Sequence, residues 1–259
     1  MTMNTTNKKP LPAPGYLERQ VDLKALLAGK SYFLFGPRQT GKSSLIAHSM
    51  KNARVYNLLD NALFLDLNRH PGRLSEELTA RDKVVVIDEI QRLPDLLNEV
   101  HHLIEERGVR FLLTGSSARK LRHGGVNLLG GRARTQYFHP FTMKELGPHF
   151  DLKRALNSGL IPSIYFSPDP NADLEAYTGN YLQQEIVAEG ATRNIPAFSR
   201  FLEIAALCNG QLLNYAKISN DAQVARSTVQ EYFQILKDTL IAYELTPWKR
   251  SFKRKPLST

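Results

Sequence analysis

The chain has 259 residues, of which 42% are hydrophobic and 23% are charged, so it can form a sizeable core and global disorder is excluded. Its net charge is +9, but five of those charges lie in the last twelve residues: Lys249, Arg250, Lys253, Arg254 and Lys255. The rest of the chain carries only about +4, so we interpret the basic character as that of a tail.

The N-terminal segment and the cysteine count indicate in which cellular compartment the protein is found. Residues 1–15 have no apolar stretch typical of a signal peptide, and we expect a flexible leader there. No apolar run is long enough for a membrane span. Cys208 is the only cysteine, which excludes an internal disulfide, and we expect it to be a small buried apolar group. These features favour a cytoplasmic protein.

The first half of the chain alternates between helical and strand patterns, which predicts an α/β fold with a parallel sheet. We expect helices over 16–28, from Lys42 and from Pro94. Expected strands cover 31–35, 54–59, 83–87, 109–114 and 135–138. The four consecutive β-branched residues of 84–87 indicate a strand that is covered on both faces.

The pattern becomes mostly helical after residue 150, which divides the chain into a larger α/β core and smaller parts. We expect a core over 16–150, a helical extension over 151–196, a module over 197–248 and a tail over 249–259. In the module, we expect helices over 198–208, 214–220 and 226–240, the last opened by a capping box at Ser227, and a strand over 241–245. Three helices and a strand are typical of a winged helix.

A phosphate-binding motif follows the first expected strand. The segment Gly36-Pro37-Arg38-Gln39-Thr40-Gly41-Lys42-Ser43 fits G-x-x-x-x-G-K-[ST] between a strand and a helix. The glycines allow a close turn, and the N–H groups of the loop and of the helix N-terminus attract anions. Lys42 supplies a point charge for phosphate, and Ser43 supplies a hydroxyl for Mg²⁺. The predicted nucleotide contacts are Gly36, Pro37, Arg38, Gln39, Thr40, Gly41, Lys42, Ser43 and Ser44.

An acidic pair, Asp88 and Glu89, ends the strand of 83–87. The carboxyl ends of parallel strands share one edge of a sheet, so Asp88 should lie beside the phosphate loop and hold Mg²⁺ together with Ser43. Glu89 is placed to activate a water for attack on the γ-phosphate. The sequence has no N-K-x-D guanine-recognition motif, and Gly130-Gly131 follows the acidic strand, unlike the signature of transporter ATPases.

Hydroxyl side chains end the next expected strand. Thr114 or Ser116 could contact the γ-phosphate or the attacking water, and Ser117 could cap the following helix. Arg132 follows a glycine pair and is our candidate for an arginine that stabilises the transition state from a neighbouring subunit. Such a role predicts a homo-oligomer.

Taken together, these motifs resemble prokaryotic AAA-type ATPases that carry a C-terminal domain of unknown function. The similarity covers residues 16–255 and includes Asp88-Glu89-Ile90-Gln91, 114–117, 129–132, 140–146, 159–162 and 227–232. It implies binding of ATP and Mg²⁺ through Lys42, Ser43 and Asp88, with hydrolysis through Glu89. The resemblance implies that such chains usually continue into a further α/β region, and we expect any activity of that region to be absent from this sequence.

Two alternatives to an active ATPase stay open at this point: a nucleotide-dependent regulator and an inert fragment of a longer gene product. A nucleotide-dependent switch or DNA-binding regulator with negligible turnover would carry the same phosphate loop. The expected helix from Arg226 has no net charge, because Arg226 and Lys237 are matched by Glu231 and Asp238, so it is a weak DNA reader by itself. DNA and a protein client therefore both remain candidate partners of the module.

Overall fold

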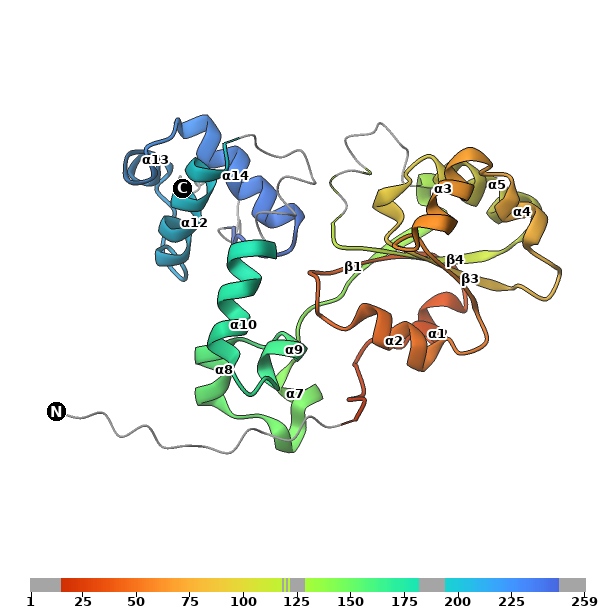
Figure 1. The fold of residues 1–259 in the computed structure, drawn as a ribbon, viewed down its shortest axis with the longest axis horizontal. Coiled ribbons are helices and arrows are strands. Elements are labelled where there is room, and N and C mark those ends of the chain that lie inside the picture. The colour runs from red at the N-terminus through yellow and green to blue at the C-terminus, as the bar shows by residue number, and fades with distance from the viewer. Residues whose placement is uncertain (1–14, 118, 120, 122–128, 182–193, 247–259) are drawn as a thin grey trace, which may run out of the picture. The chain divides into compact units, whose positions relative to one another are not determined.

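The computed structural model describes residues 15–117, 119, 121, 129–181 and 194–246 (Figure 1). The chain divides into two compact units, Met1–Tyr177 and Thr178–Thr259. No helix within the described ranges is both long enough and apolar enough to cross a membrane. The expected leader of 1–15, except for its last residue, and the whole expected tail of 249–259 lie outside the described residues.

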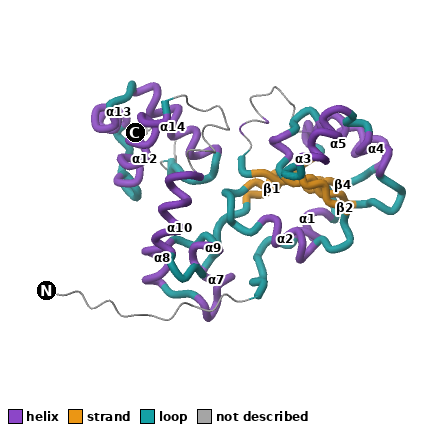
Figure 2. Tube along the Cα trace, in the orientation of Figure 1, coloured by secondary structure: helices purple, strands orange, loops and turns teal. Residues whose placement is uncertain are grey.

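The first unit is built on a five-stranded parallel sheet, which confirms the predicted fold class (Figure 2). Its strands are β1 (Ser31–Phe35), β2 (Arg54–Asn57), β3 (Val84–Asp88), β4 (Arg110–Gly115) and β5 (Ala133–Tyr137). The spatial order is β2-β3-β4-β1-β5, so the strand before the phosphate loop lies between β4 and β5. Parallel pairing aligns Phe35 with Gly115 and with Tyr137, which brings the ends of these strands to one edge.

Helices cover both faces of the sheet (Figure 1). On one face lie α1 (Leu23–Leu27) and α2 (Lys42–Ser49), whose buried leucines pack against Leu34, Val86 and Leu112. On the other face lie α3 (Asn61–Arg69), α4 (Arg73–Glu77) and α5 (Leu96–Arg107). Alternate residues of β3 and β4 therefore serve two cores, which explains their unbroken apolar sequence.

A satellite of short helices completes the first unit. It comprises α7 (Met143–Leu146), η3 (Gly147–His149), α8 (Leu152–Ser158), α9 (Pro162–Tyr165) and α10 (Pro170–Ala176), followed by the π-helix η4 (Tyr177–Tyr181). Thr142 and Glu145 form a capping box that starts α7. Phe141, Leu146 and Tyr165 form the small core of this satellite, against which Leu17 packs.

The second unit contains α12 (Ile195–Leu207), α13 (Tyr215–Ala222) and α14 (Arg226–Asp238). They share a core of apolar side chains: Phe198, Phe201, Ile218, Ala222, Val229, Tyr232, Phe233, Ile235 and Leu236. Cys208 packs against this core as an apolar group, but it is only partly buried rather than buried as expected. The three predicted helices are therefore present.

Three local expectations were wrong. Residues 16–22 are not helical, because Asp22 caps α1 and Arg19 bonds to distant carbonyls instead. Helix α14 begins at Arg226 after Ala225, with no side-chain cap, so the capping box at Ser227 does not form. Residues 241–245 form no strand; Leu240 has a φ of 60°, which turns the chain, and no partner strand lies among the described residues. The winged-helix likeness stays a prediction.

Candidate functional site

The phosphate loop lies between β1 and α2, as predicted. Gly36 is needed for space, because a Cβ at this position would overlap the carbonyl oxygen of Phe138 on the neighbouring chain segment. Gly41 is needed for conformation, since its φ of 92° is in the left-handed region that side chains disfavour. Gln39 also has a positive φ, of 59°. The loop thus turns sharply and directs its backbone toward the start of α2.

Hydrogen bonds inside the loop hold Lys42 in place. Its Nζ donates to the carbonyl oxygens of Gly36 at 2.6 Å and Pro37 at 3.0 Å, and only 6% of the residue is exposed. The hydroxyl of Thr40 donates to the Pro37 carbonyl at 2.8 Å. The ammonium group of Lys42 is thus buried and bonded to backbone carbonyls of the loop.

The acidic strand end meets the loop through Ser43. The Ser43 hydroxyl donates to Oδ2 of Asp88 at 3.1 Å, and the Thr114 hydroxyl donates to the other carboxylate oxygen. Asp88 and Thr114 are both buried, at the ends of the adjacent strands β3 and β4. The structure therefore brings together Ser43, Asp88 and Thr114, three residues that the sequence places far apart.

Glu89 follows Asp88 with φ 62° and ψ 44°, a left-handed conformation that is strained for a residue with a side chain. Burial raises the pKa of its carboxyl above the usual value, and the hydrogen bond from Gln91 and the charges of Lys42 and Arg38 offset this only in part. Strained backbone and a perturbed carboxyl are both features that concentrate at functional sites.

Ser116 lies at the carboxyl end of β4 and is 2% exposed. Its hydroxyl accepts a hydrogen bond from Nε2 of Gln91 at 3.3 Å. Ser117 accepts one from the backbone N–H of Arg119 at 3.1 Å, consistent with the predicted capping role. Among the hydroxyl candidates, Thr114 contacts Asp88 and Ser116 contacts Gln91.

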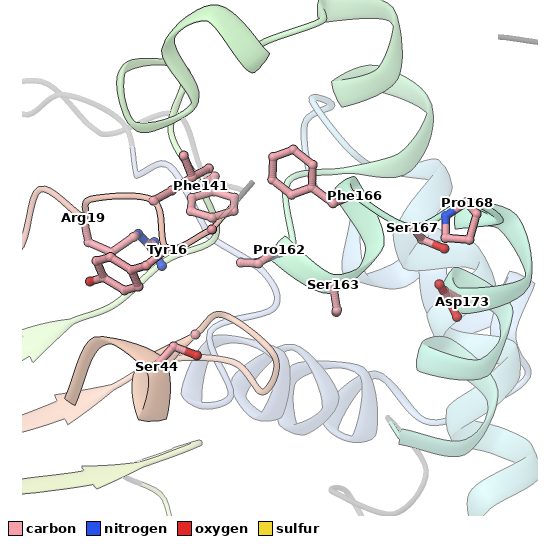
Figure 3. Close-up of a pocket in the computed structure, with 13 residues that line it drawn as sticks. Tyr16, Arg19, Ser44, Phe141, Pro162, Ser163, Phe166, Ser167, Pro168 and Asp173 are labelled. Atoms are coloured by element: carbon pink, nitrogen blue, oxygen red, sulfur yellow. The ribbon is translucent and has the colours of Figure 1, made fainter. Parts of the chain in front are cut away.

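A cavity of about 440 Å³ opens beside the phosphate loop (Figure 3). It lies within the first unit, and Gly41 and Ser44 of the loop and α2 form part of its wall. Aromatic rings from three separate segments line it: Tyr16, Phe141 and Phe166. The sequence analysis did not predict this cavity. The only signal for it is the motif of residues 159–162, part of the family resemblance, because its last residue, Pro162, lines the cavity.

Arg19 is a second feature that sequence reasoning missed. Its Nη1 donates to the carbonyl of Thr40 at 2.7 Å and its Nη2 to the carbonyl of His139 at 2.7 Å. Its guanidinium lies 4.0 Å from the centre of the Phe138 ring and pairs with Glu145. Arg19 therefore ties the last turn of the phosphate loop to the segment that follows β5.

The loop is also tied to the satellite helices. Ser163, in α9, donates from its hydroxyl to Oε1 of Gln39 at 2.7 Å. Arg38 and Gln39 are exposed, whereas Pro37 is buried. The tip of the phosphate loop is thus in direct contact with residues that line the cavity.

Arg132 is the one predicted site residue that lies away from the others. It directly precedes β5, whose opposite end, Tyr137, pairs with Phe35 next to the loop. A five-residue strand spans about 16 Å, which separates Arg132 from the phosphate loop of the same chain. Arg132 forms an ion pair with Glu105 of α5.

Comparisons with known proteins identify the two parts of the chain. A family model described as an AAA domain matches residues 28–147, and a model described as a domain of unknown function (DUF8612) matches residues 149–259. Two uncharacterized proteins, Rv2008c of Mycobacterium tuberculosis and Mb2031c of Mycobacterium bovis, are each 28% identical over 231 residues. The match covers 87% of this chain but 52% of theirs, so the chain spans about half the length of these relatives.

Distant similarity to solved structures was also found. The replication initiator DnaA bound to AMPPCP and single-stranded DNA is 12% identical, with a TM-score of 0.39 and coverage of 80% of this chain and 82% of that one. Domain III of DnaA from Thermotoga maritima is 13% identical, with a TM-score of 0.32 and coverage of 82% and 85%. Drosophila ORC bound to DNA is 14% identical, with a TM-score of 0.29 and coverage of 83% and 77%.

The matched AAA domain contains the phosphate loop, the acidic strand end and Arg132, and the second matched domain follows it almost directly. The chain thus contains an AAA domain followed by a second domain of unknown function, the arrangement that the sequence motifs resemble.

Proposed function

We propose that this chain binds ATP together with Mg²⁺ and hydrolyses it. The observation that carries the proposal is the 3.1 Å contact between Ser43 of the phosphate loop and Asp88 of the acidic strand end. It joins a phosphate-binding loop to a carboxylate that suits a metal ion. The AAA domain match supports the same class of activity.

The oxygen atoms at this contact fit Mg²⁺. The ion prefers hydroxyl and carboxylate oxygens and keeps several waters, and Ser43 and Asp88 supply one protein ligand each. When bound, Mg²⁺ would neutralise charge on the β- and γ-phosphates. Thr114 holds the carboxylate of Asp88 from the other side and so fixes its orientation.

The phosphates would be bound by the loop itself. Lys42 has its ammonium group enclosed by backbone carbonyls, and anionic oxygens are stronger acceptors than those carbonyls. The N–H groups at the start of the eight-residue helix α2 would add partial positive charge.

Glu89 is the residue we assign to water activation. Its raised pKa makes it a stronger base than an ordinary carboxylate once it is ionised. Thr114 and Ser116 stay candidates for contacts to the γ-phosphate, at the end of the strand next to Asp88.

The cavity beside the loop is our candidate site for the adenosine part of ATP. It adjoins Gly41 and Ser44, where the phosphates would end, and its aromatic side chains suit a planar base. The lack of an N-K-x-D guanine-recognition motif in the sequence favours ATP over GTP.

Binding of fluorescently labelled ATP to Lys42→Ala tests the phosphate loop, with Lys24→Ala, an exposed lysine on α1, as the matched control. We expect binding to be lost only in the first variant. Unlabelled ATP should compete far better than GTP. Equal binding by wild type and Lys42→Ala would rule out the phosphate-loop assignment.

Turnover separates this proposal from its main alternative, a nucleotide-dependent switch or DNA-binding regulator. The observation that favours the alternative is the pair of helices α13 and α14, joined by the short turn Gln223–Ala225. Residues 194–246 contain four basic and five acidic side chains, a poor balance for binding phosphate backbones. ATP binding with no phosphate release under any condition would favour the switch.

A further inference from the structure

Gln91 is a buried amide that the proposed reaction does not yet use. It lies in η1 (Ile90–Arg92), the single 3₁₀ turn that directly follows Glu89, and only 7% of it is exposed. Its Nε2 donates to the carboxylate of Glu89 and to the hydroxyl of Ser116. One amide nitrogen therefore links the acidic end of β3 to the end of β4.

The place of Gln91 is shaped by a glycine on the neighbouring strand. A Cβ at Gly115 would overlap Oε1 of Gln91, and Cδ of Gln91 would lie 3.1 Å from it. The φ of Gly115 is not in the left-handed region, so conformation alone does not require glycine there. Gly115 instead provides the space that the Gln91 amide occupies.

This packing leaves the Gln91 amide little freedom. Its Oε1 occupies the space beside Gly115, while its Nε2 donates hydrogen bonds to Glu89 and Ser116. Because Oε1 of Gln91 has no hydrogen-bond partner among the described residues, the two contacts of Nε2 are the ones that fix the amide. Gly115 and Ser116, at the end of the central strand β4, therefore hold the amide independently of its contact with Glu89.

Glu89, in contrast, has a side chain with several rotatable bonds on a left-handed backbone residue. A base must stay within hydrogen-bond reach of its water, and a misplacement of about 1 Å can cost on the order of 10²-fold in rate. A fixed N–H donor on one carboxylate oxygen restricts the rotamers of Glu89 and leaves the second oxygen to accept a proton.

We infer that Gln91 is the positioning residue for Glu89, seated in the space left by Gly115 and anchored to Ser116. The inference rests on the proposed hydrolysis by Glu89. It assigns Gln91 no contact with ATP and no proton transfer. Its effect should therefore appear in the rate of the chemical step and not in nucleotide affinity.

Gln91→Met is the test variant, because methionine keeps the length and volume of the side chain but removes the donor. We expect kcat to fall about 10- to 100-fold, as is typical when a partner that orients an active-site group is lost. KM and the affinity for labelled ATP should stay within about a factor of two of wild type. The variant loses only an interaction that matters in the transition state, not one that binds ATP. Gln136→Met, on β5, is the matched control and should turn over like wild type.

Two further variants separate positioning from a general structural effect. Gly115→Ala leaves Gln91 intact but takes the space of its amide, so it should lower kcat in the same way. In a Glu89→Gln background, Gln91→Met should cause no further loss, because a residue that acts only through Glu89 has nothing left to position. If Gln91→Met binds ATP more weakly than wild type, Gly115→Ala decides the test.

The outcomes are distinguishable. Absent turnover in wild type would remove the proposed hydrolysis and this inference with it. An active wild type with an equally active Gln91→Met would overturn the positioning role alone. Faster turnover by Gln91→Met would show that Gln91 restrains Glu89, and additive losses in the double variant would show an effect that does not pass through Glu89; each result contradicts the inference.

Discussion

Arg19 and Glu145, which are 126 residues apart in the sequence, form an ion pair whose side chains are only 5% and 4% exposed. Nε of Arg19 lies 3.0 Å from Oε1 of Glu145, and the same carboxylate oxygen accepts the backbone N–H of Gln20. The pair holds the segment before α1 against the start of α7. Because Arg19 also binds the Thr40 carbonyl, the pair supports the phosphate loop.

We expect Arg19→Ala to destabilise the first unit by about 3–5 kcal/mol, because it leaves a buried carboxylate without its partner. ATP affinity should fall as well, since the Thr40 carbonyl loses its donor. Arg19→Lys should recover little, because an ammonium group cannot bond to Thr40, His139 and Glu145 in the planar geometry of a guanidinium. Urea unfolding and labelled-ATP titration measure both effects, with exposed Arg81→Ala as control. An Arg19→Ala protein as stable as the control would contradict the assignment.

The same pair predicts a pH dependence. Burial alone would raise the pKa of the Glu145 carboxyl, but hydrogen bonds from the backbone N–H groups of Gln20 and Thr142, together with Arg19, hold it below its ordinary value of 4.5. A carboxyl whose pKa is lower in the folded state than in the unfolded state stabilises the fold at pH values above its unfolded-state pKa. This contribution is lost as the pH falls through the pKa of the folded state.

The difference in unfolding free energy between wild type and Glu145→Gln should therefore be largest near neutral pH and shrink below about pH 4.5. Urea denaturation across pH 3.5 to 7 measures it. Exposed Glu76→Gln, on α4, serves as the control, with a small difference from wild type expected throughout. If the difference in unfolding free energy between wild type and Glu145→Gln does not change with pH, the carboxylate is not stabilised by these contacts.

For Glu89, we predict that Glu89→Gln keeps ATP binding and loses on the order of 10²–10⁴-fold in turnover. The base must be ionised, so turnover should rise with pH and level off. Because burial raises the pKa of Glu89, the midpoint of that rise should lie above the ordinary glutamate value. A pH–rate profile of wild type measures it, and a midpoint at or below the ordinary value would assign the base elsewhere.

Much of this site could be predicted because its chemistry is carried by local motifs. The phosphate loop and the acidic pair each lie in a few consecutive residues, and parallel strands bring Ser43 to Asp88 without further information. The buried strands were found to within one or two residues, since apolar runs such as 84–87 have few other interpretations.

The missed features depend on contacts between distant segments. Nothing local marks Arg19 as the partner of Glu145, and the apolar spacing of residues 16–28 suits a helix until Arg19 is drawn to the phosphate loop. Gln91 and Gly115 are informative only as a pair, because the glycine provides space for a side chain from another element. The cavity likewise needs Tyr16, Phe141 and Phe166 together.

The position of Arg132 predicts complementation between subunits. It lies at the far end of β5 from the loop of its own chain, so it would have to act on the site of a neighbour. Lys42→Ala has a defective site but an intact Arg132, and Arg132→Ala has the reverse. Mixing the two inactive variants should restore part of the turnover, as it would form sites that have both residues.

Lys42→Ala mixed with Glu89→Gln is the matched control, because both lesions fall in the same site and no mixture should recover. Specific activity of wild type should also rise with protein concentration. An active Arg132→Ala variant, together with concentration-independent turnover, would remove the shared-site hypothesis.

The last prediction concerns DNA. Helix α14 exposes Ser227, Gln230 and Gln234, but Gln234 already bonds to Asp238 at 2.9 Å and Lys237 to Glu244 at 2.8 Å. The Lys237–Glu244 pair reduces the positive charge available for phosphates, which supplies most of the affinity for DNA, and the bond to Asp238 makes Gln234 less available to base edges. The largest concentration of basic side chains is instead the sequence 249–255.

We therefore expect weak binding that does not depend on DNA sequence and that falls with salt at a log–log slope no steeper than about five, roughly one unit per neutralised phosphate. Removal of residues 249–259 should abolish this binding and leave ATP turnover intact. Titration of the full and shortened chains with labelled DNA at several salt concentrations measures it. Equal affinity of the two chains, or preference for one DNA sequence that Gln230→Ala removes, would assign the contact to α14, because base-edge contacts carry sequence preference whereas phosphate contacts do not.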